Sequence, residues 1–228
     1  MKIKKKYLAY LFDLDGTLVD SEKLKAKALV ETFSTFGAKL DASVYKFVMG
    51  ESWAHVTNHF FKIAKIKPDF EIFNTKFREI YRKLLHEELT PNPNVVELLQ
   101  ILKINEKKIG LVSSSSSWMV DQVLSQLNLS DYFDVVVTNE HVTHYKPDPE
   151  AYLLALKKLS LSASEVLVFE DSKSGLLAAS SAKCDSIAFR HEFNRNNDFS
   201  LAIRIISDYK ELIGAQDWNR TSTTKIGH

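Results

Sequence analysis

The segment Tyr7–Ser21 reads YLAYLFDLDGTLVDS. Its apolar run, Tyr7–Phe12, is short, aromatic and aliphatic, which is typical of a buried strand in a parallel sheet. Asp13 and Asp15 follow this run directly, at the position where open α/β sheets bind their ligands. Two carboxylates held close together repel each other unless a cation or a shared proton compensates. The alternative interpretation is a polar turn that caps the next helix.

The composition of the 228-residue chain excludes several classes of protein. Its formal net charge of +1 argues against a dedicated nucleic-acid surface. The single cysteine, Cys184, rules out an intramolecular disulfide. The apolar start of the chain meets aspartates too soon for a signal peptide or a membrane span. We therefore expect a cytoplasmic protein without nucleic-acid or membrane partners. A monomer or weak homodimer is also expected, although no feature of the sequence decides the oligomeric state.

After the first strand, no further strand is expected before the proline-rich Thr90–Asn94. Apolar residues recur at helical spacing in three stretches, Leu24–Phe33, Trp53–Ala64 and Phe70–Leu85. Asp41 is expected to cap a further short helix that stops at Gly50. The pattern predicts an all-helical domain over residues 19–92, inserted just after the first strand.

From Asn94 onward, short apolar runs alternate with helical patterns. The expected strands are Ile109–Val112, Val135–Val137, Val166–Phe169 and Ser186–Phe189. Asn94 and Asp148 are expected to cap the helices that follow them. The alternation predicts an α/β fold over residues 1–18 and 93–214, a Rossmann-like doubly wound parallel sheet with helices on both faces. Residues 215–228 are polar and are expected to be disordered.

Polar side chains follow four of the expected strands. They are Asp13 and Asp15, then Ser113 with its neighbour Ser114, then Lys146, then Glu170 and Asp171. In a parallel sheet all carboxyl ends lie on one edge, so these groups can converge. Crowded carboxylates suit Mg2+, which commonly keeps waters and adds a phosphate oxygen. Lysine can balance the charge of a phosphate, and hydroxyl and backbone N–H groups can donate to its oxygens.

In this order the motifs resemble those of the haloacid dehalogenase-like superfamily. They are Asp13–Thr17 (DLDGT), Ser113, Lys146 in KPDPEAY, and Glu170-Asp171 in VFEDSKSG. The helical insertion resembles the small cap of the subgroup with phosphoglycolate phosphatase and β-phosphoglucomutase. The resemblance implies a strand order of 3-2-1-4-5. It also implies a Mg2+-dependent phosphatase that acts on a small phosphorylated metabolite, such as a sugar phosphate or phosphoglycolate.

The resemblance further implies roles for single residues. Asp13 would attack phosphorus and form an aspartyl-phosphate, and Asp15 would protonate the leaving oxygen and then deprotonate water. The residues placed on the phosphoryl group are Ser113, Ser114 and Lys146. Mg2+ would be held by Asp13, the backbone carbonyl of Asp15 and Asp171. Glu170 would contact Mg2+ through a water molecule or would orient the residues that bind it. The residues alone do not tell which aspartate is the nucleophile.

Other functions remain open from the sequence. The mutases of the family carry a histidine and an arginine where Lys25 and Trp53 stand here, and often a valine in place of Thr17. These differences favour a phosphatase, with a phosphomutase as the alternative. A dehalogenase would lack the second aspartate, and a binding protein without activity could share the fold.

Two further groups of side chains have plainer interpretations. Lys23, Lys25 and Lys27 are expected to form a solvated helix face, although Lys25 could overhang the cleft. His55 and His59 lack a third metal ligand nearby in sequence and are expected to be exposed.

Overall fold

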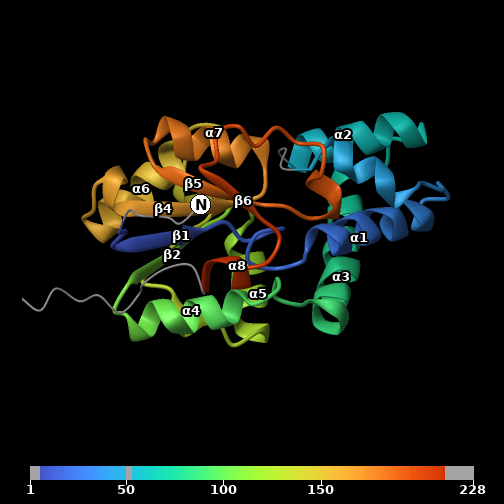
Figure 1. The fold of residues 1–228 in the computed structure, drawn as a ribbon. Coiled ribbons are helices and arrows are strands. Elements are labelled where there is room, and N and C mark those ends of the chain that lie inside the picture. The colour runs from blue at the N-terminus through green and yellow to red at the C-terminus, as the bar shows by residue number, and fades with distance from the viewer. Residues whose placement is uncertain (1–5, 50–52, 214–228) are drawn as a thin grey trace, which may run out of the picture.

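A parallel sheet of six strands forms the centre of the molecule, in the order β3-β2-β1-β4-β5-β6 (Figure 1). The computed structural model describes residues 6–49 and 53–213 of the chain. The strands are β1 Ala9–Phe12, β2 Lys108–Val112, β3 Val135–Val137, β4 Val166–Glu170, β5 Asp185–Phe189 and β6 Arg204–Ile206. The expected fold class and the order 3-2-1-4-5 are confirmed, and β6 extends the sheet beyond β5.

Helices cover both faces of this sheet, with α4, α5 and α8 on one side and α6 and α7 on the other (Figure 1). Their bounds are α4 Val95–Ile104, α5 Ser117–Gln126, α6 Glu150–Leu159, α7 Lys173–Ser181 and α8 Lys210–Ile213. In β1, Tyr10 and Phe12 pack into the first layer, and Ala9 and Leu11 pack into the second. Successive strand residues point to opposite faces, so a strand covered on both sides is apolar throughout.

The helices between β1 and α4 lie beside the end of the sheet (Figure 1). They are α1 Glu22–Thr35, the 3-10 helix η1 Ala42–Phe47, α2 Trp53–Ala64 and α3 Phe70–Glu88. Their shared core is aromatic, since the ring of Phe33 contacts those of Phe60, Phe61 and Phe73. We call this segment the helical block. The division into domains at residues 19 and 92 stays a prediction.

Several local expectations can be compared with the structure. Asn94 does not cap α4, because its φ is 60° and its side chain donates to Asp208 Oδ1 at 2.7 Å. Asp148 does accept from the N–H of Glu150, at 2.9 Å, at the start of α6. The strand β6 was not expected, because its three residues, RII, form a partly exposed edge without a continuous apolar run. The expected helix end at Gly50 and the tail 215–228 lie outside the described residues.

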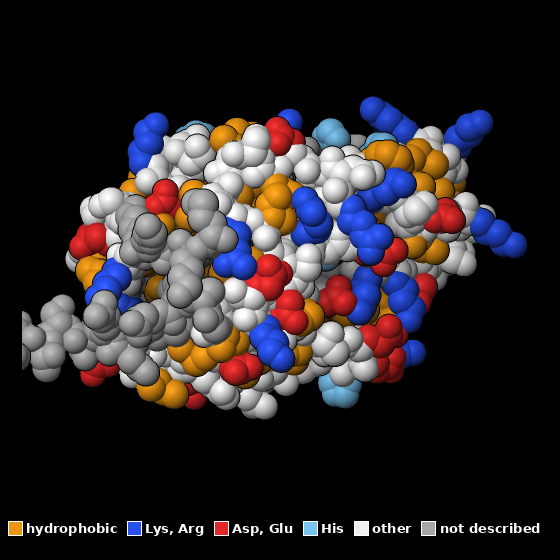
Figure 2. All heavy atoms as spheres, viewed as in Figure 1, with side chains coloured by type: hydrophobic (Ala, Val, Ile, Leu, Met, Phe, Trp, Pro, Cys, Tyr) orange, Lys and Arg blue, Asp and Glu red, His pale blue; other side chains and the backbone are white. Residues whose placement is uncertain are grey.

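The remaining short 3-10 helices lie in loops directly before or after a strand. They are η2 Ser130–Tyr132, η3 Asn139–His141, η4 Ala163–Glu165 and η5 Glu192–Asn194. None of the helices in the described part of the chain is long and apolar enough to cross a membrane. Figure 2 shows basic and acidic side chains interspersed over the visible face.

Candidate active site

The turn after β1 places the first two aspartates at the carboxyl end of the sheet. The N–H of Asp13 donates to the carbonyl of Phe169 in β4 at 3.0 Å, so the chain stays paired with β4 as far as Asp13. Gly16 then has a φ of +78°, which favours glycine. A Cβ at Gly16 would lie 2.4 Å from Asp171 Oδ2. The glycine therefore allows this turn to pack directly against the acid that follows β4.

Lys146 lies between two buried acids. Its Nζ donates to Asp13 Oδ1 at 2.6 Å, to Glu170 Oε1 at 2.7 Å and to the Val112 carbonyl at 2.9 Å. Only 4% of the lysine side chain is exposed. Burial acts to lower the pKa of Lys146, but the two carboxylates outweigh it and raise that pKa above its usual value. The lysine is therefore charged at neutral pH and offsets the repulsion between the acids.

Glu170 is fully buried and is surrounded by donors. Besides Lys146, its Oε1 accepts from the hydroxyl of Tyr152 at 2.8 Å. Its Oε2 accepts from the N–H groups of Asp171 and Ser172 at 3.1 and 3.2 Å, and from the Ser172 hydroxyl at 3.0 Å. A Cβ at Gly175 would lie 1.8 Å from Glu170, so α7 begins in contact with this carboxylate. Glu170 is thus built to orient Lys146 and the loop of Asp171.

Asp171 completes a cluster of buried carboxylates. Ligand oxygens of Asp13, Glu170 and Asp171 lie within 4.8 Å of one another. Burial raises the pKa of Asp171 to about 6, although the imidazole of His191 lowers it in part. Burial also raises the pKa of Asp13, against the lowering effect of Lys146. Carboxylate oxygens crowded this closely are a donor set that fits a hard divalent cation.

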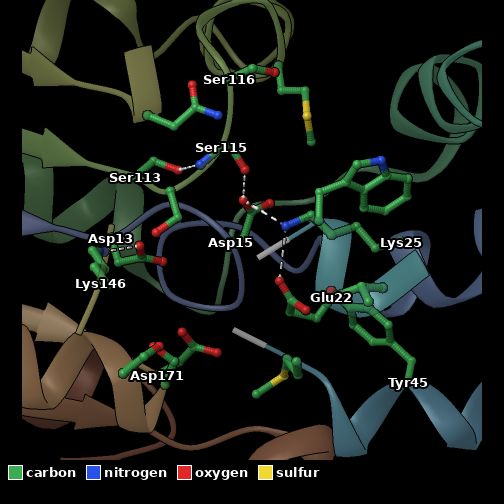
Figure 3. A pocket seen from close by; sticks show the side chains of 18 of the residues that line it. Asp13, Asp15, Glu22, Lys25, Tyr45, Ser113, Ser115, Ser116, Lys146 and Asp171 are labelled. Carbon is green, nitrogen blue, oxygen red and sulfur yellow. Dashed lines mark hydrogen bonds and ion pairs between the residues drawn. The ribbon is translucent and has the colours of Figure 1, made fainter. Parts of the chain in front are cut away.

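Asp15 points away from this cluster, towards the helical block (Figure 3). Its Oδ1 accepts from the Ser21 hydroxyl at 2.5 Å, and its Oδ2 accepts from the Ser115 hydroxyl at 2.5 Å. Lys25 Nζ lies 2.8 Å from the same Oδ2. Burial acts to raise the pKa of Asp15, but Lys25 and the hydroxyl donors lower it below its usual value. Only the backbone carbonyl of Asp15 is left as a cation ligand, and that role stays a prediction.

The expected solvated face of α1 is wrong for one lysine. Only 15% of the Lys25 side chain is exposed, and its Nζ also lies 3.2 Å from Glu22 Oε1. Lys23 and Lys27 are exposed and pair with Asp20 and Glu88, as a solvated face requires. Lys25 therefore lines the cavity, an outcome that was only the second alternative from the sequence.

The serine-rich loop after β2 forms the opposite wall. The N–H of Ser113 donates to the Val137 carbonyl at 2.9 Å, and the Ser113 hydroxyl accepts from the N–H of Ser115 at 3.0 Å. Ser113 is buried, whereas Ser114 is exposed. Both residues line the same cavity as Asp13 and Lys146. The loop therefore brings hydroxyl groups to the edge where the acids meet.

This cavity has a volume of about 270 Å³ and lies between the sheet edge and the helical block. Its floor is polar, with Asp13, Asp15, Lys146 and Asp171. Its wall on the side of the helical block is largely apolar or aromatic, and the lining residues to which sequence analysis assigned no role in the site include Tyr45, Met49, Val56, Phe77, Arg78, Trp118 and Met119. Of these, Val56 and Phe77 had been assigned to the core of the helical block from helical periodicity. A polar floor beneath an apolar wall is typical of a site for a small molecule.

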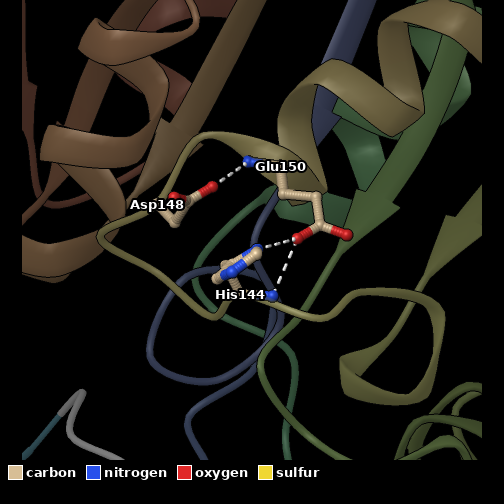
Figure 4. Close-up of side chains that lie close together, drawn as sticks. All are labelled: His144, Asp148 and Glu150. Carbon is tan, nitrogen blue, oxygen red and sulfur yellow. Dashed lines mark hydrogen bonds and ion pairs between the residues drawn. The ribbon is translucent and has the colours of Figure 1, made fainter.

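A second group of possible metal ligands lies on the loop before α6. His144, Asp148 and Glu150 are close together there (Figure 4). The Glu150 carboxylate accepts from the N–H groups of Thr143 and His144 at 2.9 and 2.7 Å, and lies 2.9 Å from His144 Nδ1. These hydrogen bonds hold the start of the helix and account for the cluster. His55 is exposed as expected, and His59 is half-buried.

The family of the chain follows from comparison with known proteins. The family described as haloacid dehalogenase-like hydrolase matches residues 10–189, and the chain belongs to this family. A phosphorylated carbohydrates phosphatase of Thermotoga maritima is 35% identical over 179 residues, which cover 78% of this chain and 83% of that protein. A phosphoglycolate phosphatase of Yersinia pestis is 31% identical over 191 residues, which cover 80% of this chain and 81% of that protein. These names agree with the enzyme class that the motifs predict.

A solved structure supports the same assignment. The crystal structure of CbbY from Rhodobacter sphaeroides in complex with phosphate has a TM-score of 0.82 and 26% sequence identity. The similarity covers 90% of this chain and 96% of that one, so it includes the helical block as well as the sheet.

The buried acids predict an unusual pH dependence of stability in the absence of metal. Asp171 has a raised pKa, so the folded protein binds its proton more tightly than the unfolded chain does. Its contribution is therefore lost as pH rises through about 6. Without metal, the free energy of unfolding should be higher at pH 5 than at pH 7.5, by about 1 kcal/mol from this group.

The measurement is thermal unfolding in EDTA at both pH values, for wild type and Asp171→Asn. Asp13, whose pKa is also raised, acts in the same direction, so the variant should lose part of the difference rather than all of it. Equal pH dependence in the two proteins would contradict the titration of Asp171.

Proposed function

We propose that the protein is a Mg2+-dependent phosphatase that hydrolyses a small phosphorylated metabolite through an aspartyl-phosphate. The observation that carries this proposal is the position of Asp13. It lies on the floor of the cavity, 2.6 Å from the Lys146 ammonium, and in the same cluster as Asp171. Phosphoryl transfer to a carboxylate requires a free acid, a fixed positive charge and a group of carboxylates that can bind a metal ion, all close to one point.

In the proposed reaction, the carboxylate of Asp13 attacks phosphorus, and the bond from phosphorus to the leaving oxygen breaks. Asp15 gives a proton to that oxygen. In the second step Asp15 accepts a proton from water, whose oxygen attacks phosphorus and releases phosphate and free Asp13. Lys25 lowers the pKa of Asp15 and so keeps this acid ionised, which is the state from which it can accept a proton in the second step. The first step needs protonated Asp15, so the ion pair with Lys25 has to open before the leaving oxygen takes the proton.

Other residues bind the phosphoryl group and the cation. Lys146 and the loop of Ser113 and Ser114 line the phosphoryl position, where their positive charge and donors would stabilise the transition state. Asp13, Asp171 and the backbone carbonyl of Asp15 would hold Mg2+, with Glu170 supporting them through the donors it orients. When bound, Mg2+ would neutralise negative charge on the phosphoryl oxygens.

The size of the cavity and the names of the relatives support a substrate such as a sugar phosphate or phosphoglycolate. The helical block supplies most of the apolar wall and would exclude water from the reacting group. We also propose that the enzyme acts in the cytoplasm, where such metabolites are found.

A phosphomutase is the second candidate. It needs a cation in the helical block for a second phosphate, and Arg78 lines the cavity. Lys25 is already paired with Asp15 and Glu22, and Trp53 donates its Nε1–H to Asn74 Oδ1 at 2.7 Å. The two positions that would mark a mutase therefore offer no free cation, which favours the phosphatase.

Phosphate release from a panel of phosphorylated metabolites, with Mg2+ or with EDTA, tests the proposal. We expect release from one or a few compounds, and its loss in EDTA. Incubation with β-glucose 1-phosphate separates the two candidates, since a mutase yields the 6-phosphate and a phosphatase yields glucose. EDTA-resistant activity, or none across the panel, would contradict the proposal.

A further inference from the structure

The loop after β5 reaches back to the acid that follows β4. His191 Nε2 lies 2.8 Å from Asp171 Oδ2, and 15% of the histidine side chain is exposed. The two residues are separated by 20 positions in the sequence. They meet because β4 and β5 are neighbouring parallel strands, so the residues after their carboxyl ends share one edge.

The hydrogen bonds of the histidine fix which nitrogen carries the proton. Its Nδ1 accepts from the N–H of Phe193 at 3.2 Å. In the neutral ring the proton is therefore on Nε2, which donates to the carboxylate of Asp171. The contact needs no charge on the imidazole, so it persists at neutral pH.

Asn194 binds the backbone of the same residue, Asp171. Its Nδ2 donates to the carbonyls of Asp171 and Phe189, both at 2.9 Å, and its Oδ1 accepts from the N–H of His191 at 2.8 Å. Asn194 is fully buried. The loop therefore clamps Asp171 at its carboxylate and at its backbone carbonyl.

The clamp leaves one oxygen of Asp171 for a ligand. Oδ2 is held by His191 and packs against Gly16, where an added Cβ would lie 2.9 Å from His191 Nε2. Among the residues that the structure describes, Oδ1 has one long contact, 3.4 Å, with the hydroxyl of Thr17. The side chain is thus prevented from turning, and a defined oxygen remains for the cluster with Asp13.

We propose that His191 is a positioning residue for the divalent cation, which orients the carboxylate of Asp171 through its Nε2–H. The role rests on the proposed function, because that function places the cation on Asp13 and Asp171. Residues behind metal ligands commonly set ligand orientation, and their loss costs roughly 10–100-fold in metal affinity. The histidine does not touch the substrate or the cation in this role.

The test is calorimetric titration of the full chain with MgCl2, without substrate, for wild type and three variants. His191→Gln keeps an N–H donor, His191→Phe keeps a flat ring without a donor, and Asp171→Asn removes the ligand. We expect His191→Phe to bind Mg2+ at least about tenfold more weakly and His191→Gln to stay within about threefold of wild type. Activity of His191→Phe should recover when the Mg2+ concentration is raised.

Unfolding temperatures in EDTA check that each variant is folded. If His191→Phe does not fold, His191→Leu replaces it as a variant without a hydrogen-bond donor. Wild-type Mg2+ affinity in a folded donor-free variant overturns the role of His191 alone. Equal weakening by His191→Gln and His191→Phe also overturns it, since the donor would then be irrelevant. Wild-type protein that binds no Mg2+, or an Asp171→Asn variant that binds as well as wild type, overturns the proposed cation site and this role with it.

Discussion

Asp13→Asn is expected to lower turnover of a generic aryl phosphate by at least about 10⁴-fold, because the amide cannot replace the attacking carboxylate. The fold should persist. Burial and the neighbouring acids raise the pKa of Asp13, so its charge already costs stability. The substitution removes that charge, while Lys146 keeps Glu170 as its partner at 2.7 Å.

Steady-state phosphate release with Mg2+ measures the loss, and thermal unfolding with circular dichroism shows whether the fold is retained. Asp20→Asn is the matched control, since Asp20 lies on the same loop but pairs with the exposed Lys23. It should keep near wild-type activity. Residual turnover by Asp13→Asn close to wild type would refute Asp13 as the nucleophile.

Lys146→Met is expected to destabilise the metal-free protein by about 3–5 kcal/mol, since it leaves Asp13 and Glu170 buried without their cation. For a chain of this size the unfolding temperature should fall by roughly 6–20 °C. Methionine keeps the length of the side chain, so the loss reports the charge and its hydrogen bonds rather than a cavity. Activity should be lost as well, because the fixed positive charge on the phosphoryl group is removed.

Unfolding in urea without metal measures this effect, with Lys23→Met as the matched control. Lys23 is exposed, and its pair with Asp20 should contribute at most about 1 kcal/mol. Adding Glu170→Gln to Lys146→Met should restore part of the stability, because one uncompensated charge is then removed. A Lys146→Met variant as stable as wild type would show that the lysine does not neutralise the acids.

The convergence of Asp13, Lys146 and Glu170 could be predicted from the sequence for a simple physical reason. A parallel sheet brings the carboxyl ends of its strands to one edge, whatever lies between them in the chain. Short buried strands can also be recognised in the sequence, because β1 and β4 are covered on both faces and are therefore apolar at nearly every position. The edge strand β6 has only one neighbour and is partly exposed, so it lacks that signal.

The contacts that orient the site could not be predicted. Lys25 has the same spacing and charge as Lys23 and Lys27, and only the packing of α1 against the cavity shows that it meets Asp15. His191 follows β5 without any motif, and its contact with Asp171 depends on the turn that Asn194 holds. The sequence could predict that Glu170 lies in the acidic cluster, but not which donors would contact its two oxygens.

Composition and strand pattern thus determined the class of fold and the sheet edge on which acids, lysine and hydroxyl groups gather. They could do so because the local pattern of apolar residues indicates which segments are buried strands. The orientation of each carboxylate was decided by folding itself. Asp13 faces Lys146 and Asp171 faces His191 through hydrogen bonds between residues distant in sequence, and Asp15 faces Lys25 through an ion pair with the helix that follows. A hydrogen bond depends on ångström-scale geometry, and that geometry exists only once the sheet, the loops and the helical block have packed together.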